Sequence, residues 1–190
     1  MLRRVHYSAM GNRRDRPLAP DLARLRGVVA DEVLDAMRAA AARLATLGVR
    51  HWVVGGLAVG AHGYPRGTKD VDFLVGDEAF ERHDGGLVTM KPGLPIQAGG
   101  VLVDHLSAKD GEEFLTADLP AAGVALEVAP LPVLLYLKLR SARLKDRADV
   151  VELIKAGAEL GKTRHWLGEH APELVAELER AAEIAAREEE

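Results

Sequence analysis

The spacing of apolar and polar residues changes along the chain, and each change predicts a different secondary-structure element. Between residues 21 and 47, apolar residues recur every three or four positions, which predicts a helix in one or two pieces with Asp31 as a cap. Gly48 follows where a helix-ending glycine belongs. Residues 51–54 form a short apolar run and residues 70–75 alternate between polar and apolar side chains, so both are expected to be strands.

The middle of the chain begins with an expected helix and continues with expected strands. Asp77 has the position of an N-cap for a helix over residues 78–83, so its carboxylate is expected to be structural. From there on, short apolar runs follow one another with Gly and Pro between them, which predicts strands that are antiparallel in part. These expected strands cover residues 87–90, 96–97, 101–106 and 124–128.

Helical spacing returns after Pro130. The chain is expected to be helical up to residue 157, and residues 162–190 are expected to form one or two polar helices with Pro172 at a helix start. The predicted organisation is a flexible basic tail over residues 1–20, a core domain over residues 21–157 and a C-terminal helical extension over residues 158–190.

Composition narrows the class of protein. At 190 residues, of which 48% are hydrophobic and only 4% aromatic, the chain suits one α/β core with Ala-rich helices. The formal net charge of -4 argues against a surface for duplex DNA. The absence of cysteine excludes disulfides, thiolate catalysis and cysteine-based zinc sites. No apolar run approaches the length of about 18 residues that a membrane helix needs, so a cytoplasmic protein without membrane contact is expected.

Asp70 and Asp72 are the first candidates for chemistry. Residues two apart in a strand face the same side, so these carboxylates are about 6.5 to 7 Å apart. They repel each other by roughly 2 kcal/mol at an effective dielectric constant near 20. Mg²⁺ removes this cost, and it is typically held by one or two carboxylates together with substrate phosphates. Gly55 and Gly56 begin the expected turn into a short helix, where glycine lets backbone N–H groups approach a phosphate. A nucleoside triphosphate with Mg²⁺ would satisfy both parts.

The motif as a whole resembles a known family, the nucleotidyltransferases of the DNA polymerase β type, and in particular the small bacterial branch that includes the AbiEii toxins. In that family an apolar strand, two small residues and a short helix precede an Arg-x-Thr/Ser-x-Asp-x-Asp sequence. The matching residues here are Gly55, Gly56, Arg66, Thr68, Asp70 and Asp72. The resemblance implies a nucleotidyltransferase core of α+β class over residues 21–157, with a mixed sheet flanked by helices and further helices after it. It also implies a Mg²⁺ or Mn²⁺ cofactor and nucleotide contacts by the glycines, Arg66 and Thr68.

Asp104 stands in the middle of an otherwise apolar expected strand. A buried carboxylate is costly unless it is paired or bound to a metal, so its presence requires an explanation. In the resembled family a third carboxylate on a neighbouring strand completes the metal site and accepts the proton of the attacking hydroxyl, and the resemblance implies this role for Asp104. One alternative is a structural Asp104 that holds a turn or an arginine. The other is Glu127 as the third carboxylate.

The expected helices after Pro130 extend the resemblance. The family carries a Lys on the first helix, then an Arg and a Lys-Asp-x-x-Asp sequence. The matching residues are Lys138, Arg143, Lys145, Asp146 and Asp149. The resemblance implies that Lys138 reaches the triphosphate and that Lys145 or Asp146 closes the nucleotide site. The alternative is a surface of helical salt bridges, in which Lys145 pairs with Asp149 four residues later.

Two functions from different classes follow. The first is an enzyme that moves a nucleoside monophosphate from an NTP to a hydroxyl group of RNA or protein. In a toxin of this branch, an antitoxin protein would be a further partner. The second is a non-catalytic module that binds a nucleotide or a partner protein, and the presence of all three carboxylates counts against it.

Overall fold

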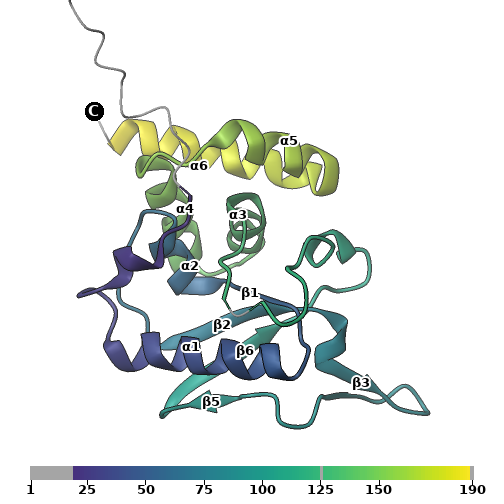
Figure 1. The fold of residues 1–190 in the computed structure, drawn as a ribbon. Coiled ribbons are helices and arrows are strands. Elements are labelled where there is room, and N and C mark those ends of the chain that lie inside the picture. The colour runs from purple at the N-terminus through teal and green to yellow at the C-terminus, as the bar shows by residue number, and fades with distance from the viewer. Residues whose placement is uncertain (1–18, 125, 189–190) are drawn as a thin grey trace, which may run out of the picture.

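A four-stranded mixed sheet organises the structure, a computed structural model that describes residues 19–124 and 126–188 (Figure 1). Most of the expected basic tail, up to residue 18, therefore lies outside the described residues. One helix covers one face of the sheet, and the remaining helices lie on the other side. The helices are α1 (Asp31–Thr46), α2 (Gly55–Ala61), α3 (Leu131–Leu139), α4 (Leu144–Lys155), α5 (Leu160–His170) and α6 (Val175–Glu188).

The strand order of the main sheet is β1-β2-β6-β5. Strands β2 and β6 are parallel, whereas β1 pairs with β2, and β5 with β6, in antiparallel fashion. The strands are β1 (His51–Val53), β2 (Asp70–Val75), β5 (Gln97–Ala98) and β6 (Val101–Leu106). The predicted fold class, a mixed sheet flanked by helices and followed by C-terminal helices, is therefore confirmed.

Helix α1 covers its face of the sheet with one apolar stripe. The buried residues of this stripe are Val33, Leu34, Ala36, Met37, Ala40, Ala41 and Leu44. They share a hydrophobic cluster with Phe73 of β2. Gly48, with φ +71°, follows the helix in the left-handed conformation predicted for it. Asp31 is not the cap, because Ala30 takes that position without a side-chain hydrogen bond; Asp31 lies in the first turn, where a carboxylate interacts favourably with the helix dipole.

The C-terminal half of the chain covers the opposite face. Trp52 of β1 and Leu74 of β2 belong to a second hydrophobic cluster with residues of α3 and α4. The same cluster includes Leu167 of α5 and Leu178 of α6, so the last two helices bury their apolar faces in it. Pro172 begins a short 3-10 helix directly before α6, close to its predicted place. None of the helices between residues 19 and 188 combines the length and the apolar character that a membrane span requires.

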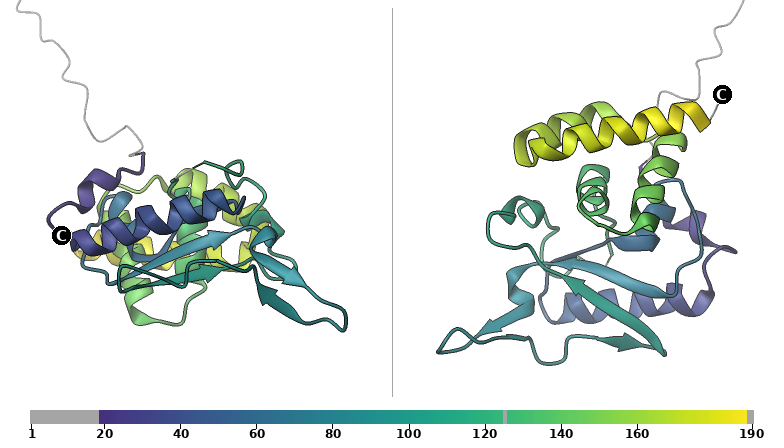
Figure 2. Two further views of the ribbon diagram at one scale, coloured as in Figure 1. Left: turned by 60° about the horizontal axis from the view of Figure 1, so that its bottom comes forward. Right: turned by 180° about the vertical axis from the view of Figure 1, so that it is seen from behind.

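The predicted helix over residues 78–83 is wrong. This part of the chain consists of a 3-10 helix, Asp77–Ala79, and of strand β3 (Phe80–Arg82), which pairs with β4 (Val88–Met90). The two strands form a hairpin that extends away from the main sheet (Figure 2). Gly85 and Gly86 in its turn have φ near +85°, a conformation that glycine adopts at little cost. The strand pairing outweighs the weak helical tendency of the residues before the turn.

The predicted strand over residues 124–128 is reduced to a single bridge in its described part. Val128 pairs with Val53 in parallel fashion. The Val53 N–H donates to the Glu127 carbonyl at 2.8 Å, and the Ala129 N–H donates to the Val53 carbonyl at 2.9 Å. The segment therefore covers the outer edge of β1 with two hydrogen bonds and then enters α3.

Candidate functional site

Every site residue predicted from the sequence lines one cavity of about 280 Å³. Strands β2 and β6 contribute the carboxylates, the start of α2 contributes the glycines, and α3 and α4 contribute the lysines. The predicted residues in its wall are Gly55, Gly56, Arg66, Thr68, Asp70, Asp72, Asp104, Lys138, Lys145 and Asp146. Val54, Leu106, Leu134, Leu137, Ser141 and Arg143 complete the wall. Their common location supports a single site, and the role of each residue stays a prediction.

The three carboxylates lie on the same face of β2 and β6. Asp72 stands directly opposite Asp104 in the parallel pairing, and Asp70 precedes Asp72 by two residues. Side chains alternate between the faces of a sheet, so Val71 and Val103 point the other way and are buried in the cluster under α1. The Thr68 hydroxyl donates a hydrogen bond of 2.7 Å to Asp70. The register of the sheet thus brings the third carboxylate beside the first two.

The pKa of Asp72 reflects its burial and the repulsion among the three carboxylates. Burial, together with the negative charges of Asp70 and Asp104, raises the pKa of Asp72 to about 6 from an ordinary value of 3.8. A proton or a bound cation relieves the repulsion among the carboxylates. The acidic group is therefore chemically suited to a cation.

This pKa predicts a pH dependence of stability in metal-free buffer. Between pH 3.8 and about pH 6 the folded state retains a proton on Asp72 that the unfolded state has lost. Raising the pH through this window should therefore destabilise the wild type relative to Asp72→Asn, which cannot ionise. Urea unfolding of both proteins at several pH values from 4 to 7 measures the difference. A difference in stability that stays constant with pH would contradict the assignment.

Asp104 is exposed, and the expectation that it is a buried carboxylate is wrong. Strand β6 buries only the face that carries Val103, whereas Leu102 on the other face is 62% exposed. The alternative third carboxylate, Glu127, is also exposed, and it lies at a different cavity beside Pro20. The structure therefore brings Asp104, and not Glu127, beside Asp70 and Asp72.

The donor set fits a magnesium ion held by two carboxylates. Within the described residues, no three His, Asp or Glu side chains are grouped as ligands of one metal ion. Asp70 and Asp72 are partly buried, and Asp104 is exposed beside them. An open pair of carboxylates matches Mg²⁺, which takes its remaining ligands from water and phosphate.

The two glycines make room for the side chains of the site. A Cβ atom on Gly55 would overlap Oδ2 of Asp72, and one on Gly56 would lie 2.8 Å from Oγ1 of Thr68. Gly55 also has φ +61°, which is unfavourable for other residues. This close packing is a reason for glycine here in addition to the phosphate approach expected from the sequence.

Substitution of Gly55 by alanine should be more harmful than substitution of a glycine with open surroundings. Gly27 has a similar φ of +75°, but a Cβ atom added there would have no atom within 4 Å. Gly27→Ala should therefore cost about 1 to 2 kcal/mol for the backbone alone. Gly55→Ala should lower the free energy of unfolding by more than this and should displace the Asp72 side chain. Urea unfolding of both variants compares them, and equal losses would show that the contact with Asp72 is unimportant.

A buried ion network joins the loop before β2 to α3 and α4 at the basic side of the cavity. Asp149, only 1% exposed, accepts hydrogen bonds of 2.6 and 2.7 Å from Arg66 and lies 2.9 Å from Nζ of Lys138. Lys138 also donates to Asp146 at 2.5 Å, and Asp146 accepts a further hydrogen bond from Ser141. Burial raises the pKa of the Asp149 carboxyl, but hydrogen bonds from Arg66 and Lys138 outweigh it, so the pKa is lowered.

The network contradicts one prediction from the sequence and places Asp149 behind the wall of the cavity, in contact with Arg66 and Lys138. The alternative salt bridge from Lys145 to Asp149 does not form, because Asp149 pairs with Arg66 and Lys138 instead. Asp149 is predicted from the sequence only as the partner of Lys145, although it is the second Asp of the Lys-Asp-x-x-Asp sequence. Its position one helical turn after Asp146 was the available signal.

Two cations at the cavity are more accessible than Lys138. The two positive charges of Arg66 and Lys138 are balanced by the two carboxylates that bind them. The Arg143 side chain is 75% exposed and lies 3.7 Å from Asp146. Lys145 is exposed and forms no ion pair with any described residue. These two side chains provide the positive charge that is available to an anion.

Comparisons with known proteins give a distant structural similarity. Neither a scan against models of protein families nor a search of curated proteins finds a match. Among solved structures, the chain is similar to an antigenic nucleotidyltransferase-like protein from Paracoccidioides brasiliensis. The TM-score is 0.42 and the identity 17%, over 80% of this chain and 94% of that one. A proposal about function therefore depends on the motif residues and on the cavity.

Proposed function

We propose that the protein is a metal-dependent nucleotidyltransferase, which transfers a nucleoside monophosphate from an NTP to a hydroxyl group. The observation that carries this proposal is the single cavity in which three carboxylates on β2 and β6 share a wall with the cations of α3 and α4. Mg²⁺ with a triphosphate is a ligand that matches both kinds of charge at once. In a surface of salt bridges the carboxylates would be paired with basic side chains, whereas Asp70, Asp72 and Asp104 form no ion pair with any described residue.

The residues have distinct roles in the proposed reaction. Asp70 and Asp72 would hold Mg²⁺, which supplies charge neutralisation at the phosphates and at the leaving pyrophosphate when it is bound. Asp104 accepts the proton of the acceptor hydroxyl, whose oxygen bonds to the α-phosphorus while the bond to pyrophosphate breaks. Proton acceptance by an exposed carboxylate is sterically possible for a large acceptor such as RNA or protein.

The basic residues would bind and orient the triphosphate. Arg143 and Lys145 contact its phosphates directly, because their side chains are exposed at the cavity. Lys138 reaches the triphosphate only if it gives up one of its ion pairs with Asp146 or Asp149. Arg66 and Thr68 keep their neighbours in place through hydrogen bonds to Asp149 and Asp70.

The AbiEii-like branch is part of the proposal. It is supported by the Arg-x-Thr-x-Asp-x-Asp sequence and by the Lys-Asp-x-x-Asp sequence, which line the same cavity through Arg66, Asp70 and Asp146. In a toxin of that branch the acceptor would be RNA or protein, and an antitoxin protein would be the partner.

Incubation with each α-labelled NTP, Mg²⁺ and a cell extract tests the proposed function. The wild type should transfer label to RNA or protein, and Mn²⁺ with the accepted NTP should raise its melting temperature. Asp70→Asn should lose both effects. Asp77→Asn, which changes an exposed carboxylate outside the cavity, is the matched control and should retain both. Binding of NTP without transfer to any acceptor would favour the non-catalytic module, and no response in either assay would contradict the proposal.

A further inference from the structure

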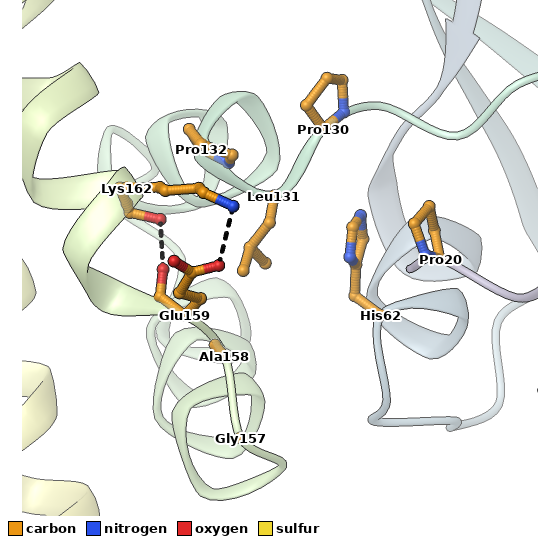
Figure 3. Close-up of a pocket in the computed structure, with 10 residues that line it drawn as sticks. Pro20, His62, Pro130, Leu131, Pro132, Gly157, Ala158, Glu159 and Lys162 are labelled. Carbon is orange, nitrogen blue, oxygen red and sulfur yellow. Dashed lines mark hydrogen bonds and ion pairs between the residues drawn. The ribbon is translucent and has the colours of Figure 1, made fainter. Parts of the chain in front are cut away.

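A second cavity, of about 180 Å³, lies apart from the candidate site (Figure 3). It is formed where the chain leaves α2, enters α3 and passes from α4 to α5. Most of its wall is apolar, with Pro20, Pro130, Leu131 and Pro132 around it. None of the residues assigned to the candidate site lines it. The proposed transferase reaction therefore gives this cavity no function.

His62 is the polar group that the apolar wall surrounds. It is only 7% exposed, and its Nε2 lies 2.8 Å from the Ala129 carbonyl. A carbonyl oxygen only accepts hydrogen bonds, so Nε2 carries the proton and Nδ1 is an acceptor. Burial lowers the pKa of His62, which keeps the ring neutral. Nδ1 has no hydrogen-bond partner among the described residues.

The surroundings of His62 are poorly suited to a water molecule. A buried water needs about two to four polar partners, whereas most of the wall is apolar, with three prolines and Leu131 among its residues. The charged groups in the wall, Glu159 and Lys162, form an ion pair with each other at 3.1 Å (Figure 3). An apolar ligand with one hydrogen-bond donor would satisfy Nδ1 and cover the apolar wall at the same time.

We propose that this cavity binds a small aromatic ring that carries one O–H or N–H donor, of the phenol or indole type. An apolar cavity of about 150 Å³ accommodates benzene, so a cavity of about 180 Å³ has room for one ring with a short substituent. The ring contacts Leu131 and the prolines, and its donor bonds to Nδ1 of His62. The inference does not depend on the proposed transferase activity.

Binding of phenol and toluene to the full-length protein tests this inference, because the two differ only by a hydroxyl in place of a methyl group. A cavity without an acceptor should bind toluene about 5- to 150-fold more tightly, since burial of an unpaired hydroxyl is unfavourable. With Nδ1 as the acceptor, phenol should bind at least as tightly as toluene. Methyl NMR signals of Leu131 locate both ligands during the titration.

Substitutions and larger probes complete the test. Leu131→Trp should fill the cavity and abolish the binding of phenol without loss of folding. N-acetyltyrosinamide distinguishes the source of the ring: binding comparable to that of p-cresol indicates a tyrosine of a partner protein, and binding of p-cresol alone indicates a free small molecule. A clear preference for toluene, no shift of the Leu131 signals with either ligand, or undiminished binding to folded Leu131→Trp would overturn the proposal.

Discussion

Replacing Asp104 with asparagine should lower the rate of nucleotidyl transfer by about 10²- to 10⁴-fold, the typical contribution of a general base. Asparagine has nearly the same size, but it does not accept the proton of the acceptor hydroxyl. Because Asp104 is exposed, forms no hydrogen bond with a described side chain and repels Asp72, the melting temperature should not fall. Single-turnover rates with saturating NTP, measured beside thermal unfolding, test both expectations.

The matched control for this variant is Asp110→Asn. Asp110 is also exposed, but it lies outside the cavity, so its replacement should affect neither rate nor stability. A near-normal rate for Asp104→Asn would remove Asp104 from the mechanism. Glu127 would not be a substitute, because it lies at another cavity. The general base would then have to come from Asp70, Asp72 or the acceptor itself.

The second large effect concerns stability. Asp149→Ala should lower the free energy of unfolding by about 3 to 5 kcal/mol, the usual cost of removing one partner from a buried ion pair. Asp149 is almost fully buried. Without its negative charge, the positive charges of Arg66 and Lys138 are only partly neutralised. Urea unfolding at neutral pH measures the change.

Asp35→Ala provides the comparison for Asp149→Ala. Asp35 forms an ion pair with Arg38, but its side chain is 77% exposed. Exposed pairs contribute about 0 to 1 kcal/mol, so this variant should unfold almost like the wild type. If the two variants lose similar amounts of stability, the network at Asp149 is not a stabilising centre of the molecule.

The local patterns of the sequence predicted the elements that carry the site. Gly48 marked the end of α1, and the alternation from Asp70 onward marked a strand with one polar face. The family motif connected distant residues such as Gly55 and Lys138, which periodicity alone does not do. The residues that the resemblance grouped in this way line one cavity, and the role of each stays a prediction.

Two of the wrong predictions concern contacts between elements that are distant in the sequence, which local patterns do not reveal. Alternation shows which residues share a face of β6, but not whether other elements cover that face, so Asp104 was expected to be buried. The ion pair of Arg66 with Asp149 spans 83 positions and depends on the packing of α4. The pair Gly85 and Gly86 is typical of a hairpin turn and favours the β3–β4 hairpin over the helix predicted from Asp77 as an N-cap.

The parallel pairing of Asp72 with Asp104 determines where the chain accepts inserted residues without loss of the site. Backbone hydrogen bonds between β2 and β6 fix this alignment, and residues 76–100 connect the two strands through the β3–β4 hairpin and β5. Extra residues at the tip of the β3–β4 hairpin would lengthen this connection and leave the alignment intact. A slip of one residue in β6 would instead turn Asp104 towards α1 and His105 towards the cavity. The hairpin is accordingly the natural place for inserting a reporter or a purification tag.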